Sequence, residues 1–193
     1  VHMTLSCYKP VLNTHKTLVD ENGFFFKRIT KEKANEFDLD ELYNEFCAQI
    51  DKAINAGIKI THLDSHHHVH TLEEFRPAIE KILKKYDLPI RGGFEYELKY
   101  DKIVPMLGSF YSKNVEADYF EKHIDEIKQY KVVDVMSHPA FVDAFLSKST
   151  SYSIERTKEH EILTSEELKK FFESNDIKIT NYRNIGESEG SKI

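Results

Sequence analysis

The chain has 193 residues, enough for one well-packed domain and too few for two of ordinary size. Its composition, 40% hydrophobic and 31% charged, is that of a folded protein and excludes a disordered chain. A formal net charge of −6 argues against a nucleic-acid partner, because binding a phosphate backbone requires a concentrated basic surface. No apolar stretch approaches the roughly 18 residues of a membrane span, so no membrane partner is expected.

The two cysteines give no sign of disulfide bonding or of a cysteine-based metal site. Cys7 and Cys47 form neither a disulfide framework nor a CxxC motif, so both are expected to be small buried hydrophobic residues. This usage fits a cytoplasmic location. The chain opens in what reads as the middle of a domain, so a targeting segment could precede Val1. Without repeats, low-complexity tracts or linkers, residues 1–193 are predicted to form a single domain.

Strand and helix patterns alternate from the N-terminus onward. Residues 1–6 alternate apolar and polar side chains, which indicates a strand. Residues 38–56 carry an apolar stripe with helical spacing, and Gly57 follows where a C-terminal cap belongs. A buried strand is predicted over 59–63, ending in Asp64. The stripe of the helix comprises Leu39, Leu42, Tyr43, Phe46, Ile50, Ala53 and Ile54.

The alternation continues to the C-terminus. Thr71 and Glu74 form a capping-box pattern that predicts the start of a second helix. Thr164 and Glu167 repeat that pattern and predict the start of a last helix. The inward residues expected of these two helices are Phe75, Ile79, Ile82 and Leu83, then Leu168, Phe171 and Phe172. A further helix is predicted over 118–130, and strands over 89–94, 131–136 and 178–182.

Strands that alternate with amphipathic helices predict an α/β fold with a mainly parallel sheet. Metal-capable side chains follow two of the predicted strands, Asp64 and His66 after one and His138 after the other. In barrel-type α/β folds, the carboxyl ends of the strands carry the chemistry. A barrel-like sheet is therefore the preferred architecture, and an open doubly wound sheet is the alternative.

A histidine-rich segment is the most distinctive feature of the chain. Residues 62–70 (HLDSHHHVH) hold five of its ten histidines. Neutral imidazole is a favoured ligand of zinc and similar ions, and a neighbouring carboxylate such as Asp64 can orient it. The segment follows a predicted buried strand and precedes a predicted helix, as an active-site loop does. The alternative is a solvent-exposed tract with only adventitious metal affinity.

Two further histidines are candidates, each with a plainer alternative. His138 follows a predicted strand and precedes Pro139, which favours an extended geometry that could aim the ring into a site. A structural role for His138 is the alternative. His2 lies in the first predicted strand, and the residues after it favour a native histidine over a His-Met cloning remnant.

Several motifs, taken in order, resemble the YdjC-like family, and closely its chito-oligosaccharide deacetylase members. They are residues 1–5 (VHMTL) with Lys9-Pro10, residues 19–23 (VDENG), residues 62–70, residues 137–141 (SHPAF) and residues 163–165 (LTS). The resemblance spans nearly the whole chain. It implies a distorted (β/α) barrel related to polysaccharide deacetylases. It also implies an enzyme that uses a divalent metal, Mg or Zn, to remove acetyl groups from N-acetylated amino sugars, as in chitin degradation.

The resemblance also implies roles for individual residues. His2 and His66 become the two histidine ligands of the metal, and His138 the active-site histidine near the leaving group. Asp64 becomes a carboxylate that orients a ligand. Arg156 resembles a charged position shared by the family, and it is expected to bind substrate, as is Phe141 through sugar stacking.

One family feature has no counterpart in these 193 residues. The family begins with a strand ending in a tandem-aspartate motif, N-A-D-D-F-G, which supplies the third metal ligand and the presumed base. The natural place of this motif is upstream of Val1, so the domain is expected to lack its first βα units, and the chain alone is expected to show little or no activity. The expected partner is an N-acetylated oligosaccharide, and the oligomeric state is left open. The alternatives are another metal-dependent hydrolase, such as a phosphoesterase or amidohydrolase, or a non-catalytic sugar-binding relative.

Overall fold

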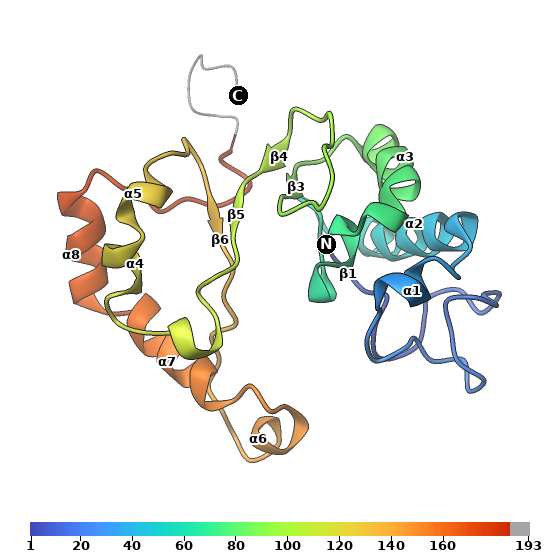
Figure 1. Ribbon diagram of the computed structural model, residues 1–193, viewed down its shortest axis with the longest axis horizontal. Coiled ribbons are helices and arrows are strands. Elements are labelled where there is room, and N and C mark those ends of the chain that lie inside the picture. Colours follow the sequence, from blue (N-terminus) through green and yellow to red (C-terminus); the bar gives the residue numbers. More distant parts are fainter. Residues whose placement is uncertain (186–193) are drawn as a thin grey trace. The chain divides into compact units, whose positions relative to one another are not determined.

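The computed structural model describes residues 1–185 (Figure 1). Contacts divide the chain into two compact units, the first comprising Val1–Val104 and the second starting at Pro105. The single domain expected from the sequence stays a prediction. Within the described residues, no helix is both long and apolar enough to cross a membrane.

The strands of the first unit pair in parallel, as the alternation of strands and helices predicts. β1 (His2–Met3) pairs with β2 (Asp64–Ser65), and β3 (Ile90–Arg91) pairs with β4 (Ile103–Val104). A parallel bridge between Leu63 and Ile90 connects the β2 segment to β3. The strands are shorter than predicted, and β2 begins at Asp64 rather than ending there.

Helix α2 (Leu39–Asn55) confirms the longest predicted helix and its signals. The Asp38 side chain caps it by accepting hydrogen bonds from the backbone N–H groups of Asp40 and Glu41, at 2.8 and 3.0 Å. Gly57 follows the helix with a φ of +79°, a left-handed conformation that glycine adopts without steric cost. A short helix, α1 (Lys31–Ala34), precedes α2.

The next helix begins later than the sequence predicts. Two 3-10 turns, η1 (His66–Thr71) and η2 (Glu73–Phe75), come first, and α3 (Arg76–Tyr86) follows with a proline in its first turn. The Thr71 hydroxyl donates a hydrogen bond to the His68 carbonyl at 2.8 Å. The predicted Thr71–Glu74 capping box is therefore wrong, because the Thr71 hydroxyl stabilises the turn η1 instead of capping a helix.

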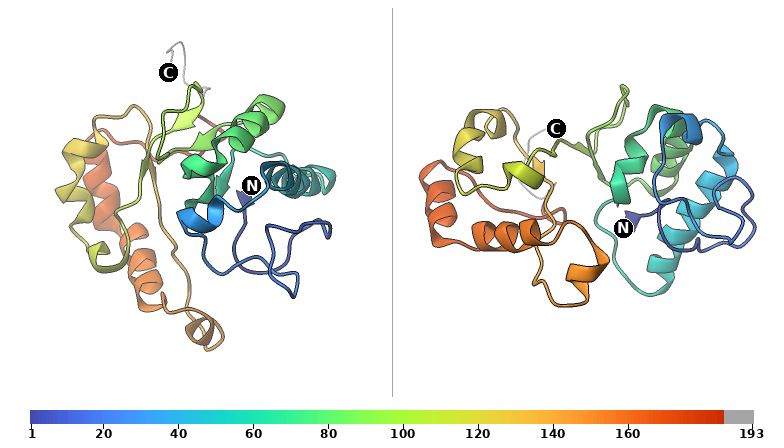
Figure 2. Two further views of the ribbon diagram at one scale, coloured as in Figure 1. Left: turned by 45° about the vertical axis from the view of Figure 1, so that its right-hand side comes forward. Right: turned by 60° about the horizontal axis from the view of Figure 1, so that its bottom comes forward.

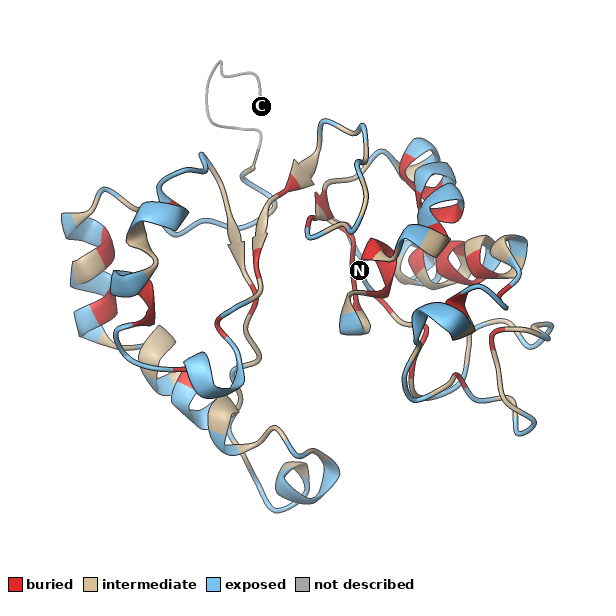
Figure 3. Cartoon of the chain, viewed as in Figure 1, coloured by how far each residue is buried: buried red, intermediate tan, exposed pale blue. Residues whose placement is uncertain are grey.

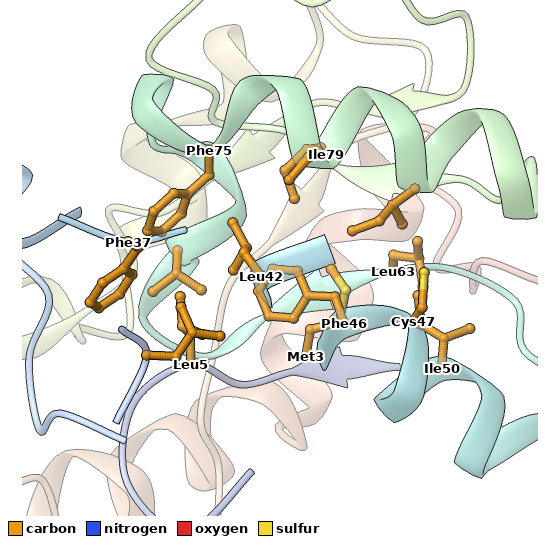
Figure 4. Packing of buried hydrophobic residues seen from close by; sticks show 14 of the residues in the cluster. Met3, Leu5, Phe37, Leu42, Phe46, Cys47, Ile50, Leu63, Phe75 and Ile79 are labelled. Atoms are coloured by element: carbon orange, nitrogen blue, oxygen red, sulfur yellow. The ribbon is translucent and has the colours of Figure 1, made fainter. Parts of the chain in front are cut away.

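The hydrophobic core of the first unit lies between α2, α3 and the first strands (Figure 4). Helices α2 and α3 run side by side (Figure 2), and buried positions alternate with exposed ones along both (Figure 3). The predicted inward residues of α3 are all buried, whereas Ile54 at the end of α2 is 46% exposed. Of the cysteines, Cys47 is buried as expected, and Cys7 is only half-buried. Core residues include Met3, Leu5, Phe46, Leu63, Phe75 and Ile79.

The second unit repeats the parallel pairing with β5 (Met106–Leu107) and β6 (Asp134–Val135). Its helices are η3 (Ser112–Asn114), α4 (Tyr119–Lys122), α5 (Ile124–Ile127), α6 (Leu146–Ser149), α7 (Ile154–Leu163) and α8 (Glu166–Ser174). They enclose a second core that includes Leu107, Phe110, Phe120, Ile127, Leu168 and Phe172.

Three predictions for this unit need correction. The helix expected over 118–130 is divided at His123, whose ring nitrogen bonds the Tyr119 carbonyl at 2.8 Å. Ser165, one residue after Thr164, caps α8 by accepting a hydrogen bond from the Leu168 N–H. Residues 178–182 form no strand in the structure.

Candidate functional site

The register of β1 against β2 brings together two residues that are 62 positions apart in the chain. His2 and Asp64 are partners across this parallel pair, and the His2 Nδ1 lies 2.7 Å from the Asp64 Oδ2. Asp64 is buried, whereas the His2 side chain is 53% exposed. The carboxylate therefore receives the Nδ1 proton of His2, which leaves Nε2 as the lone-pair nitrogen of that ring.

The neighbouring strand adds a cation to this pair. Arg91 on β3 places its Nη1 3.1 Å from the Asp64 Oδ2. Burial by itself raises the pKa of Asp64, but the hydrogen bond with His2 and the charges of His2 and Arg91 outweigh it, so the pKa lies below its usual value. Asp64 is thus an ionised carboxylate suited to orienting the His2 imidazole. The sequence did not identify Arg91 as a partner of Asp64.

His66 lies beside His2, as the sequence predicts. Their ring centroids are 5.7 Å apart, with the ring planes at 71°. With metal–nitrogen distances of about 2.1 Å, two imidazoles that share one ion have centroids roughly 5 to 6 Å apart. The spacing of this pair therefore fits a shared cation. In residues 1–185, however, no group of three or more His, Cys, Asp or Glu side chains is arranged to hold a metal ion.

The turn that presents His66 has a left-handed backbone. His67 and His68 both have a φ of 54°, a conformation that residues other than glycine adopt at some steric cost. The Ser6 hydroxyl lies 3.0 Å from the His67 Nδ1, and the His66 and His67 rings lie 3.9 Å apart. The turn is thus tied to Ser6, which follows β1, the strand that carries His2.

His70 is a fully buried member of the histidine-rich segment. Its Nε2 lies 2.9 Å from the Arg91 carbonyl oxygen and must donate to it, so Nδ1 accepts from the Ser65 hydroxyl at 2.5 Å. His70 therefore joins β2 to β3 and holds the backbone of Arg91, whose guanidinium pairs with Asp64. His70 is therefore not solvent-exposed, whereas His67 in the same segment is exposed.

We expect His70 to make the protein sensitive to acid. Its burial lowers its pKa from 6.5 to about 4. Below pH 6.5 the His70 imidazole is protonated in the unfolded chain but stays neutral in the folded chain. The free energy of unfolding therefore falls as the pH drops from about 6.5 to about 4. The shift corresponds to about 3 kcal/mol at pH 4. Urea unfolding across this range measures it, and His70→Gln should flatten the profile; an equally steep profile in the variant would contradict the assignment.

In the second unit, side chains of helix α7 bind both the backbone N–H and the backbone carbonyl of His138. The His138 N–H donates a hydrogen bond to Glu159, which is fully buried. The His138 carbonyl accepts one from the Arg156 Nη1 at 2.9 Å. Because Arg156 and Glu159 are three residues apart, they lie on the same face of α7. No pattern in the sequence indicates Glu159, since a glutamate in so charged a helix is expected to face solvent.

The same two side chains also hold Tyr152. Its hydroxyl donates a hydrogen bond to the second oxygen of Glu159, and its carbonyl accepts from the Arg156 Nε at 2.8 Å. Burial and the bond to Glu159 both raise the pKa of Tyr152. Arg156 thus has main-chain partners on two residues, and its predicted contact with substrate stays a prediction. Phe141 is 84% exposed, with its ring 4.4 Å from that of His160, and its predicted role also stays a prediction.

Comparison with known proteins agrees with the motifs in both units. A model of the YdjC-like protein family matches residues 1–174. Proteins named carbohydrate deacetylase are similar: one from Vibrio cholerae is 34% identical, covering 94% of this chain and 73% of the relative, and one from Halalkalibacterium halodurans is 37% identical, covering 85% and 71%. A crystal structure from Enterococcus faecalis, described as a candidate cellobiose-phosphate cleavage protein, is 32% identical with a TM-score of 0.85, covering 96% of this chain and 76% of that one.

Proposed function

The chain belongs to the YdjC-like protein family, and from this premise we propose that it is a metal-dependent carbohydrate deacetylase that hydrolyses the acetamide of N-acetylated amino sugars. One observation carries the proposal: His2, oriented by the buried Asp64, lies beside His66 at the spacing of two imidazoles that share an ion. Carbohydrate deacetylase is the name of several relatives of this chain.

The proposal includes an incomplete distorted (β/α) barrel. In the first unit, β1 pairs with β2, the Leu63 bridge leads to β3, and β3 pairs with β4, so the parallel strands are neighbours in chain order. A doubly wound sheet would reverse this order at a switch point. His2 and Asp64 are register partners at the starts of β1 and β2, so the parallel pairing places both side chains at the same level of the sheet.

The two imidazoles of the first unit suit a zinc ion held with help from further ligands, whereas magnesium prefers oxygen ligands. His2 and His66 would hold the ion, with Asp64 fixing the tautomer and direction of the His2 ring. When bound, the metal supplies Lewis-acid polarisation of the amide carbonyl and a more acidic water. The resemblance to the family assigns the third ligand and the base to a tandem-aspartate motif.

The second unit supplies the proton for the leaving group. Hydrolysis breaks the amide C–N bond, and the departing sugar nitrogen needs a proton to leave as an amine. His138 is suited to this step because an imidazole has a pKa of about 6.5 and can both hold and donate a proton near neutrality. The products are acetate and an amino sugar. Chito-oligosaccharides as substrates and a cytoplasmic site of action are part of the same proposal.

Product analysis tests this function against its rivals. With Mg²⁺ or Zn²⁺ added, the full-length gene product should release acetate from N,N′-diacetylchitobiose and no phosphate from a generic phosphate monoester or from cellobiose phosphate. Phosphate release without acetate would contradict the deacetylase assignment and favour a phosphoesterase. Tight sugar binding without either product would favour a non-catalytic relative.

A further inference from the structure

Two tyrosines of the second unit form a stacked pair beside His138. The Tyr111 and Tyr152 rings are 4.5 Å apart and nearly parallel, at 6°. Both present an edge-on geometry to the His138 ring, with centroid distances of 5.7 Å for Tyr111 and 5.8 Å for Tyr152. We call this pair, Tyr111 and Tyr152, the aromatic platform.

The outer member of the aromatic platform remains accessible. Tyr111 keeps 43% of its surface exposed, although Tyr152 covers one face of its ring. An exposed aromatic ring in a fixed place is a binding surface for flat apolar groups, since it offers a large contact area with few rotatable bonds. The C–H faces of a pyranose ring are such groups.

The aromatic platform is fixed before any ligand arrives. The Tyr152 hydroxyl is anchored by the buried Glu159 and accepts a hydrogen bond from the Ser112 N–H at 3.3 Å. The Tyr111 N–H donates to the Ser109 carbonyl at 2.8 Å, which holds the backbone of the outer ring. Ligand binding then costs little ordering of these side chains, which favours affinity.

One buried carboxylate positions both the platform and the histidine. The two oxygens of Glu159 accept from the His138 N–H and the Tyr152 hydroxyl. A group that stacks on Tyr111 is therefore held at a set place relative to the His138 imidazole. Such coupling is useful where the histidine must reach one atom of a bound ring.

We propose that the aromatic platform is a sugar subsite. The sugar bound there is the one whose nitrogen His138 protonates, and the apolar face of its pyranose ring stacks on the platform. The pyranose specified here rests on the proposed deacetylase function, whereas the stacking surface and its distance from His138 are properties of the second unit. Tyr111 is then a residue that contacts substrate, and Tyr152 is the residue that supports it.

Binding and kinetics with single variants test this subsite. Tyr111→Ala should weaken binding of N,N′-diacetylchitobiose, followed by NMR shift changes, by about 10-fold. It should raise KM by a similar factor with little change in kcat, because the ring binds substrate without moving a proton. Tyr111→Phe should retain the wild-type affinity, since it keeps the ring. Tyr130→Ala is the matched control, because Tyr130 is a 40% exposed tyrosine of the same unit.

The outcomes separate this inference from the proposed function. Unchanged sugar binding in Tyr111→Ala, or a loss in Tyr111→Phe as large as in Tyr111→Ala, overturns the subsite. A wild-type protein that does not bind the disaccharide also overturns it. Sugar binding that depends on the Tyr111 ring, without acetate release by the full-length protein, supports the subsite and contradicts only the deacetylase function.

Discussion

Replacing His66 with alanine should lower the affinity for a divalent metal by at least about 100-fold, the largest change expected from a single side chain of the first unit. Under the proposed function, the two rings, whose centroids are 5.7 Å apart, each supply one nitrogen to the ion, and the loss of either removes one ligand. Elemental analysis after dialysis against Zn²⁺ and calorimetric titration both measure the effect. His2→Ala should lose a comparable share of the affinity.

The control for this experiment is an imidazole that lies elsewhere. His160→Ala removes a half-buried histidine of the second unit, where its ring packs against Phe141, and should leave metal binding unchanged. Circular dichroism of each variant checks that the fold is retained. Metal content in His66→Ala equal to that of the wild type would show that His66 is not a ligand.

In the full-length gene product, Glu159→Gln should reduce kcat by at least about 10-fold, because displacing a catalytic group by about 1 Å can cost up to 100-fold in rate. The carboxylate accepts one hydrogen bond on each oxygen, from the His138 N–H and the Tyr152 hydroxyl. A glutamine keeps one acceptor and turns an amide donor toward the other. Glu159→Ala removes the acceptor of two half-buried donors, at a cost of about 1 kcal/mol each in unfolding free energy.

Tyrosine titration gives this prediction a readout that fold stability alone does not move. Burial and Glu159 raise the pKa of Tyr152, so Glu159→Gln should lower that pKa, as seen in the ultraviolet absorbance of tyrosinate. The matched control is Glu161→Gln, an exposed glutamate two residues along the same helix. Equal kcat and equal tyrosine titration in the two variants would contradict a positioning role for Glu159.

Membership of the YdjC-like family does not depend on the result for either variant. The chain matches the YdjC-like family over residues 1–174, and the histidine segments 62–70 and 137–141 lie inside that range. The variants instead test which side chains of this chain bind the metal and which position His138. The metal experiment concerns the first unit alone, and the Glu159 experiment concerns the second unit alone.

Local signals in the sequence were sufficient for much of the secondary structure. Asp38, the apolar stripe after it and Gly57 together predict α2, and the structure confirms the helix with both of its ends. Such signals act between residues three or four positions apart, so a short window of sequence contains them. The dense run of histidines likewise identified the segment of the candidate site, because that residue type carries its chemistry wherever it folds.

Tertiary structure alone decided which side chains meet. The register of β1 on β2 pairs His2 with Asp64, and the Leu63–Ile90 bridge brings Arg91 to the same carboxylate. Glu159 is fully buried because two donors from other segments surround it, although its own helix is highly charged. The strand predicted over 178–182 is wrong for the same reason. A strand forms only where its backbone can hydrogen-bond to a neighbouring strand, and the pattern of its own residues does not show whether one is there. Contacts between distant segments depend on how whole elements pack, and no local pattern encodes that packing.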